Sequence, residues 1–402
     1  MKKLLATILA LVMALGVTTI SWADENNYVT IDGLADENGA LIHYDTLTAA
    51  AKAWRESKRI VTSDGNFGSH PAELTEVESI VWTIHGTVDT GNGEGVIGSV
   101  NAAILSGGYI YPAVSIKKIV VKGEDNATIT DSISAGKGNG FTYIGGSGAD
   151  VTIEHVAFPA YAYANSQCKS ITFNNCKFEK GLKILQAAEV SVTNNTFTND
   201  GTTDPALFVQ NCTAEIKISG NNISGYMRGM NIQAGNDAVV TIDNNTISDL
   251  TDANKGSAIQ LTSGKTFTVT NNTISNAPAN AFRIYENCPA ESITINNNTI
   301  SAKYLCWNQG YDMSKVSSAD NTCSIEVPGA CAVGGNEIAQ SDFTINVKTV
   351  TPPRYYYNST TTDTKADTTK GSPKTFDAGI GIYALTAVLS ATGMAWTAKK
   401  RH

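Results

Sequence analysis

One eight-residue pattern recurs in seven segments of this chain. The copies are Val151–Phe158, Ile171–Phe178, Val190–Phe197, Ile216–Ile223, Val240–Ile247, Phe267–Ile274 and Ile293–Ile300. Their first residues, at 151, 171, 190, 216, 240, 267 and 293, are 20, 19, 26, 24, 27 and 26 residues apart. A period in this range indicates stacked repeats, because one repeat cannot bury its apolar side without a neighbour. The chain is therefore predicted to form a solenoid.

The columns of the pattern assign a role to most positions. Positions 1 and 3 are apolar and position 2 is polar in every copy, an alternation that predicts a strand. Position 5 is Asn in five copies, His155 in one and Gly220 in one, so we expect a turn with a positive φ. Position 6 starts with Val156 and is Asn in the last five copies, which predicts inward amides that bond to one another. Position 8 is Phe or Ile throughout, a second buried column.

A second short strand precedes each copy. Its outer members are apolar and its middle member varies, which predicts inward, outward and inward side chains. These strands are expected at 141–143, 161–163, 182–184, 207–209, 230–232, 259–261 and 282–284. Each coil then holds two or three strands, and six steps of about 4.8 Å give a stack of roughly 29 Å.

With these strands and Asn-rich turns in register, residues from about 80 to 345 resemble the right-handed parallel β-helix family. Pectate lyases, polygalacturonases and many surface proteins share that fold. The resemblance implies an all-β, right-handed parallel β-helix over 80–349. It does not imply an activity, because this fold supports many unrelated functions.

The segment before the solenoid contains two recognisable parts. Residues 1–23 have the pattern of a secretory signal peptide, with an apolar run at 4–17 and a small-x-small end at Ser21–Ala23; an N-terminal membrane helix is the alternative. Residues 24–79 form the predicted N-terminal cap region.

Within this cap region, one face of a short helix is apolar and Asp45 or Thr46 can serve as its N-cap. The apolar positions are Leu47, Ala50, Ala51 and Trp54. We expect this helix to cover the first coil, because the open end of a strand stack is prone to association. Ile80–Ile84 and Lys118–Val121 are expected to be early coils, separated by a Gly-rich excursion at 89–115.

The segment after the solenoid reads as an anchor. The repeat is expected to decay after Ile300, and 350–371 is rich in Thr and lacks apolar periodicity, which predicts a stalk. Residues 378–398 carry no charge and would span about 31 Å as a helix, with a basic tail behind them.

The residues before that apolar span resemble the sortase cell-wall sorting signal of Gram-positive bacteria. That family has a Pro-x-Thr-Gly motif, an apolar span and a basic tail; here Phe376 stands in place of Gly and Ser372 where many members have Leu. The motif residues are Ser372, Pro373, Lys374, Thr375 and Phe376, within a sorting region at 372–402. The resemblance implies cleavage after Thr375 and linkage to peptidoglycan; a plain C-terminal membrane anchor at 378–398 is the alternative.

Charge and cysteine content limit the partners. The chain has a net charge of −8, and loss of residues 1–23 leaves 27 bases against 37 acids, a net of −10. Such a surface repels nucleic acid and uncomplexed polyuronates. No Cys/His spacing indicates zinc, and we expect no metal and no cofactor. Most of the seven cysteines are expected to be small core residues, whereas Cys323 and Cys331 are close enough to pair.

A functional surface is expected on the outward residues of the second strand. We expect the outward column of this strand to consist of Thr142, Ala162, Lys183, Phe208, Asn231, Gln260 and Arg283. Two residues further on, the later coils add Gln210, Gln233, Thr262 and Tyr285. Amides, one exposed aromatic ring and two cations suit hydrogen bonding and stacking with neutral sugars, and the column holds no carboxylate. Glycosidases need two acids, and a lyase of this fold needs acids for calcium plus a basic proton acceptor.

An enzyme is still possible if loop residues supply the acids. Asp204, Arg228 and Asp252 precede successive coils, and two coil steps place the acids roughly 10 Å apart. The simpler interpretation is that these are solvated turn residues. The sequence therefore favours an exported, surface-anchored and monomeric adhesin or glycan-binding module without catalysis, with a polysaccharide lyase or glycoside hydrolase as the alternative.

Overall fold

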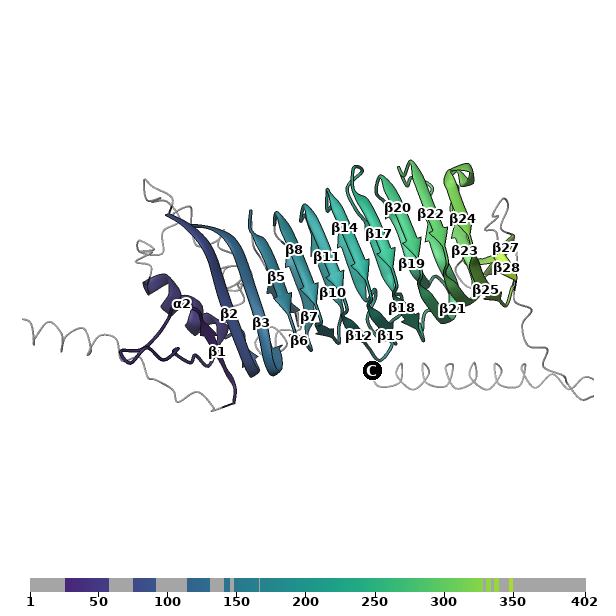
Figure 1. The fold of residues 1–402 in the computed structure, drawn as a ribbon. Coiled ribbons are helices and arrows are strands. Elements are labelled where there is room, and N and C mark those ends of the chain that lie inside the picture. Colours follow the sequence, from purple (N-terminus) through teal and green to yellow (C-terminus); the bar gives the residue numbers. More distant parts are fainter. Residues whose placement is uncertain are drawn as a thin grey trace, which may run out of the picture. The chain divides into compact units, whose positions relative to one another are not determined.

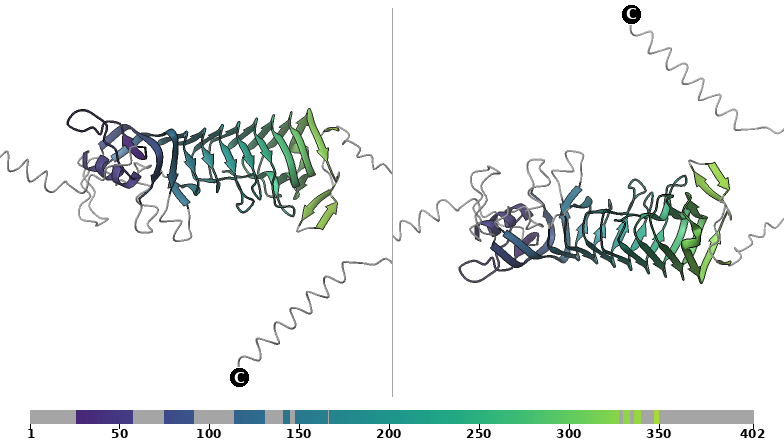
Figure 2. Two further views of the ribbon diagram at one scale, coloured as in Figure 1. Left: turned by 90° about the horizontal axis from the view of Figure 1, so that it is seen from below. Right: turned by 90° about the horizontal axis from the view of Figure 1, so that it is seen from above.

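The computed structural model describes residues 26–57, 75–91, 114–130, 141–144, 148–165, 167–327, 330–333, 336–339 and 347–349. All of them lie in one compact unit that ends at Pro352. Parallel strands make up most of this unit, and strands at equivalent places in successive coils lie side by side (Figures 1 and 2).

Each complete coil contributes three strands, one to each of three parallel ladders. The first ladder contains β4 (Phe141–Ile144), β7 (Tyr161–Asn165), β10 (Leu182–Leu185), β13 (Leu207–Gln210), β16 (Met230–Gln233), β19 (Ser257–Ser263) and the ends of β21 (Thr273–Ile284) and β23 (Thr299–Asn308).

The second ladder carries positions 1 to 3 of the repeated pattern. It contains β2 (Thr75–Asp89), β3 (Val114–Thr130), β5 (Asp150–Glu154), β8 (Ser170–Asn174), β11 (Glu189–Thr193), β14 (Glu215–Ser219), β17 (Val239–Asp243), β20 (Thr266–Thr270), β22 (Ser292–Asn296) and β24 (Val316–Ala319).

The third ladder carries position 8. It contains β6 (Ala157–Phe158), β9 (Lys177–Phe178), β12 (Thr196–Thr198), β15 (Asn222–Ser224), β18 (Thr246–Ser248), the starts of β21 and β23, β25 (Asn321–Ile325) and β28 (Val347–Thr349). A separate antiparallel pair is formed by β26 (Ala330–Val333) and β27 (Asn336–Ala339).

The predicted inward and outward columns are confirmed. Residues at positions 1, 3 and 8 of all seven copies are buried, whereas position 2 is half-buried or exposed. Position 8 includes a stack of three rings, in which the centroids of Phe158 and Phe178 are 5.3 Å apart and those of Phe178 and Phe197 are 4.7 Å apart. Apolar burial along these columns, worth about 25 cal/mol per Å², is the main stabilising term of such a core.

The predicted turn at position 5 is also confirmed. All seven residues there have a φ between 52° and 67°, in the left-handed region that Asn and Gly tolerate best. A residue with a branched Cβ would be strained at this point, which explains the narrow choice of side chains in this column.

Buried asparagine side chains form the predicted ladder at position 6. The Oδ1 atom of Asn245 accepts bonds from the backbone N–H of Asn221 at 3.0 Å and from its Nδ2 at 2.9 Å. The Nδ2 atom of Asn245 in turn donates to Asn272 Oδ1 at 2.9 Å and to the carbonyl of Ile218 at 3.0 Å. The same arrangement runs through Asn195, Asn221, Asn245, Asn272, Asn298 and Asn321. Each amide is therefore buried with its hydrogen bonds made.

The expected decay of the repeat after Ile300 is wrong. Val316–Cys323 makes an eighth turn of the same kind, in which Asp320 has a φ of 56° and Asn321 extends the amide ladder. Val316 pairs with Ile293, and Cys323 pairs with Ile300. Polar Ser318 at position 3 concealed this copy in the sequence.

Cys323 does not form the disulfide with Cys331 that their closeness in the sequence would allow. It is a free cysteine, 1% exposed, at position 8 of the eighth copy, where it continues the column of Phe and Ile side chains. Cys176, Cys212 and Cys288 are likewise free and buried, and Cys168 is buried, as expected of small core residues.

The early coils and the helix before them are present. Strands β2 and β3 contain the expected segments at 80–84 and 118–121, and strand β1 (Tyr28–Ile31) pairs with β2 in antiparallel fashion. Helix α2 (Leu47–Ser57) begins after Thr46, whose Oγ1 accepts from the backbone N–H of Ala49 at 3.1 Å. Its four apolar positions are at most 3% exposed; its role as a cap over the first coil stays a prediction.

Several expectations lie outside the described residues: the signal peptide at 1–23, most of the excursion at 89–115, the stalk at 350–371, and the sorting region at 372–402 with its span at 378–398. Among the residues that are described, no helix has the length and apolar character needed to cross a membrane.

Replacing Asn245 with alanine should destabilise the fold. The change removes the acceptor of two Asn221 N–H bonds and the donor to the Ile218 carbonyl, and it leaves these buried groups unpaired. We expect a loss of about 2–4 kcal/mol in the free energy of unfolding, measured by urea denaturation. The control is Asn222→Ala, whose exposed side chain should contribute less than about 0.5 kcal/mol. Equal effects of both changes would contradict a stabilising amide ladder.

Buried thiols should resist alkylation in the folded protein. Burial raises the pKa of Cys176 to about 12 and those of Cys212 and Cys323 to about 11, so the reactive thiolate is scarce at about pH 8. Iodoacetamide should label these three residues only after denaturation in guanidinium, as read by mass spectrometry of their peptides. Rapid labelling of any of them in the native protein would show that its coil opens.

Candidate functional site

The outward side chains of the first ladder form one column in register. We call this set the outward column; it consists of Tyr163, Lys183, Phe208, Asn231, Gln260, Arg283 and Trp307. Tyr143 occupies the same register position in β4. Five of these seven residues match the predicted column. The first two members of the predicted column, Thr142 and Ala162, do not.

The assignments of Thr142 and Ala162 to this column are wrong by one residue. Ala162 pairs with Leu182 and is 0% exposed, so it faces the core, whereas Tyr163 pairs with Lys183 and is half-buried. Thr142 shares the register of Ala162. Tyrosine was counted as apolar and therefore inward, but a ring with a hydroxyl group also suits a surface position, and alanine fills the interior of this coil.

Two cation–aromatic groups lie in the outward column. The Nζ atom of Lys183 is 4.9 Å from the ring centroid of Phe208 and 5.5 Å from that of Tyr163. The guanidinium carbon of Arg283 is 3.9 Å from the ring centroid of Trp307 and 4.5 Å from that of Tyr285. Trp307 is itself only 7% exposed and directly follows buried Cys306 in the strand. The sequence did not predict it as a member of the column, because the repeat was expected to end at Ile300.

Uncharged polar side chains fill the space between the two groups. Thr262 Oγ1 donates to Asn231 Oδ1 at 3.2 Å and is 3.4 Å from Gln260 Nε2. Gln210 Nε2 donates to Gln233 Oε1 at 3.5 Å. The eight residues predicted to bind a ligand lie in the first ladder or directly after it; they are Lys183, Phe208, Gln210, Asn231, Gln233, Gln260, Arg283 and Tyr285. Gln260 is only 3% exposed and contributes little accessible surface.

The cations of the outward column have no carboxylate partner among the described residues. Arg283 is 9% exposed and donates Nε to Gln309 Oε1 at 3.4 Å. Burial lowers the pKa of Arg283, and the charge of Arg228 acts in the same direction.

Asp204 and Arg228 form an ion pair beside this column. The guanidinium donates Nε to Oδ1 and Nη2 to Oδ2 of Asp204, and Nη1 lies 3.4 Å from Gln260 Oε1. The hydrogen bonds to Asp204 raise the pKa of Arg228. Asp252 has a different role, because its Oδ1 accepts the backbone N–H groups of Asn254 at 3.0 Å and Lys255 at 3.1 Å. Each of the three alternative catalytic residues thus has a structural partner.

The other loop acids also bond within their turns. The hydroxyl of Thr202 donates to Asp200 Oδ1 and lowers the pKa of Asp200, and the amide of Asn276 does the same for Asp249. A general acid needs a raised pKa, so these shifts have the wrong direction for proton donation.

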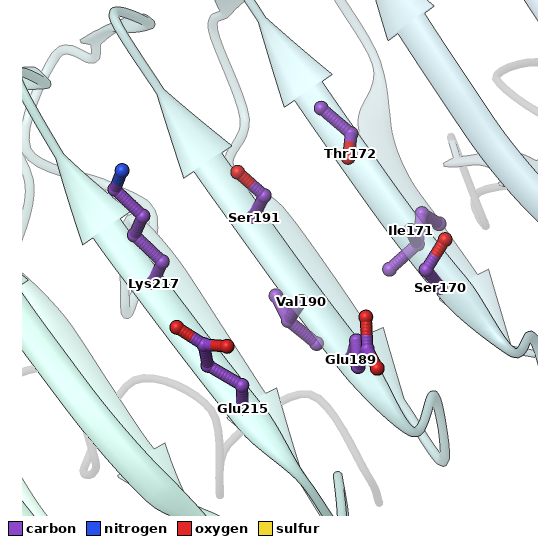
Figure 3. A pocket seen from close by; sticks show the side chains of 8 residues that line it. All are labelled: Ser170, Ile171, Thr172, Glu189, Val190, Ser191, Glu215 and Lys217. Atoms are coloured by element: carbon purple, nitrogen blue, oxygen red, sulfur yellow. The ribbon is translucent and has the colours of Figure 1, made fainter.

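A depression of ≈ 260 Å³ lies on the outward face of the second ladder (Figure 3). Glu189 and Glu215 occupy neighbouring strands in register, and Lys217 stands two residues beyond Glu215. The depression is lined by Ser170, Ile171, Thr172, Glu189, Val190, Ser191, Glu215 and Lys217. This lining contains no aromatic ring, so it offers no surface on which a sugar could stack. Within the described part of the chain, no group of three or more His, Cys, Asp or Glu residues could hold a metal ion.

A family model for the right-handed beta helix region matches residues 160–323. No curated protein and no solved structure matches the chain. The matched segment contains the parallel ladders from β7 to β24 and part of β25, and together with these ladders it supports a right-handed β-helix.

Proposed function

We propose that this chain is a non-catalytic glycan-binding protein of the bacterial cell surface, and that the outward column of the first ladder is its binding face. The observation that carries the proposal is the register of Tyr163, Phe208 and Trp307 in one column, with the amides of Asn231 and Gln260 between Phe208 and Trp307. Aromatic rings supply apolar area to the faces of sugars, and amides bond to sugar hydroxyls with both donors and acceptors.

The dimensions of the face favour an elongated ligand. Six strand steps separate Tyr163 from Trp307, which corresponds to about 29 Å along the stack. Contacts spread over that length suit a carbohydrate chain better than a single sugar.

Support for surface attachment comes from sequence patterns alone. The signal-like pattern at 1–23 indicates export, and the sorting-like residues Ser372–Phe376 with the apolar span at 378–398 indicate attachment to peptidoglycan or to the membrane. The proposed partners are accordingly the cell wall at the C-terminus and a glycan-bearing surface at the first ladder.

The alternative of a polysaccharide lyase or glycoside hydrolase relies on Asp204, Arg228 and Asp252. Both carboxylate oxygens of Asp204 face the Arg228 guanidinium, and Asp252 holds its own turn, so structure explains these side chains without catalysis. The proposal therefore leaves catalysis out.

The full-length protein should bind neutral glycans or mucin in surface plasmon resonance and should release neither reducing ends nor unsaturated products from them. Phe208→Ala should weaken binding about fivefold or more, because an aromatic contact near the centre of a binding face often exceeds 1 kcal/mol. Val239→Ala, on the second ladder at 47% exposure, is the control and should bind as the parent does.

Two results would contradict the proposal. One is unchanged glycan binding by Phe208→Ala. The other is release of products from a polysaccharide panel that Asp204→Asn or Asp252→Asn abolishes, which would establish the enzyme.

A further inference from the structure

The outward column contains two cations for which the described residues supply no counter-ion. We infer that the glycan bound there carries isolated anionic groups, carboxylate or sulfate, along an otherwise neutral chain. This inference rests on the proposed glycan-binding function and specifies its ligand.

Arg283 provides the stronger of the two sites. It is 91% buried, since its exposed fraction is 9%, and its guanidinium lies against Trp307 and Tyr285. Only Nε has a hydrogen-bond partner within the described chain, the Gln309 side chain. A guanidinium in this position presents paired donors that match a carboxylate or a sulfate.

A second arginine on the same surface serves as an internal comparison. Arg228 has side-chain exposure of 26%, and Asp204 neutralises it through two hydrogen bonds. Arg283 is more deeply buried and has no such carboxylate among the described residues. Because a partly desolvated charge without a counter-ion is unfavourable, an anionic group on the ligand would compensate the charge of Arg283.

Lys183 sets the spacing of the anionic groups. Four strand steps separate it from Arg283, about 19 Å along the stack. The outward column between them holds Phe208, Asn231 and Gln260, none of which carries a charge. Two anions bound at both cations would therefore be separated by several neutral sugars.

The net charge of the chain argues against a densely charged ligand. At −8, the protein repels a polyanion over its whole surface, and two local cations cannot compensate for a charge on every sugar. Sparse anionic groups gain the local attraction and experience little of the general repulsion.

The test compares four ligands on the full-length protein by isothermal titration calorimetry. They are a neutral galactose–N-acetylglucosamine tetrasaccharide, the same chain with one terminal sialic acid, the same chain with one sulfate ester, and polygalacturonate. At least one singly charged chain should bind about tenfold more tightly than the neutral chain, as expected for a charge-assisted hydrogen bond. The sialylated and sulfated arms distinguish the two sources of the anion.

Arg283→Gln should abolish this preference, so that the neutral and the singly charged chains bind the variant with equal affinity. Lys217→Gln, which removes the same charge from the exposed face of the second ladder, is the matched control and should keep the preference. If Arg283→Gln lowers the unfolding temperature, the parent protein is titrated at low and at physiological ionic strength instead. Its preference for the charged chain should be weaker at physiological ionic strength, because salt screens the attraction between charges.

The outcomes separate this inference from the function on which it rests. Equal affinity for neutral and singly charged chains overturns the inference and leaves glycan binding in place. If polygalacturonate binds most tightly of the four, the inference that the ligand carries only isolated charges is overturned. Binding of none of the four ligands, together with none in the mucin experiment, overturns the proposed function itself.

Discussion

The amide ladder at the turn between the second and third ladders fixes the register of the whole stack. Each Asn side chain bonds both to the next Asn and to the backbone of the preceding coil, as Asn245 does with Asn272 and Ile218. A shift of one residue in any coil would leave these buried groups unpaired, at a cost of about 1–3 kcal/mol for each group. Such a shift would also turn every outward side chain of that coil inward. The alignment of the outward column therefore depends on hydrogen bonds made inside the solenoid.

This constraint also explains where the chain is free to vary. The turn from the second to the third ladder has nearly the same length in every copy of the pattern, because the amide ladder passes through it. Insertions lie instead in the two other connections of the coil. Between the third and first ladders the connection is short after Phe178 and long after Phe197 and Ile247. Loops of different length thus meet the edge of the first ladder, and they bring Asp204 and Arg228 beside the outward column. The proposed binding face can therefore vary at this edge while the core stays uniform.

The sequence predicted the features that repeat and failed where a single coil departs from the repeat. Burial of the Asn column followed from Val156 at its start, and the turn at position 5 followed from the tolerance of Asn and Gly for a positive φ. The pattern did not predict which side chains of the strand at 161–163 face inward. Tyr163 can lie on either side of a sheet, whereas the small Ala162 fills a narrow interior. The eighth copy was missed since Ser318 and Cys323 replace the larger apolar residues of earlier coils. The pairing of Arg283 with Trp307 depends on this later coil, and so that part of the site was not predictable from the repeat alone.

The way in which the cations are held determines whether they can bind a ligand. A cation over an aromatic ring gains about 0.5–1 kcal/mol at an exposed site and about 2 kcal/mol when desolvated. A hydrogen bond to a charged group contributes about 1.5–3 kcal/mol. An anion bound by Arg283 would not have to displace a carboxylate, because its described neighbours Trp307 and Tyr285 are uncharged rings. At Arg228 the same anion would first have to displace Asp204 and leave that carboxylate partly buried without its partner. Rings therefore orient a cation without neutralising it, and the side chain loses little further conformational freedom when a ligand arrives. If the face binds a glycan as proposed, the contrast between Arg283 and Arg228 favours the aromatic groups, rather than the ion pair, as the part that recognises the ligand.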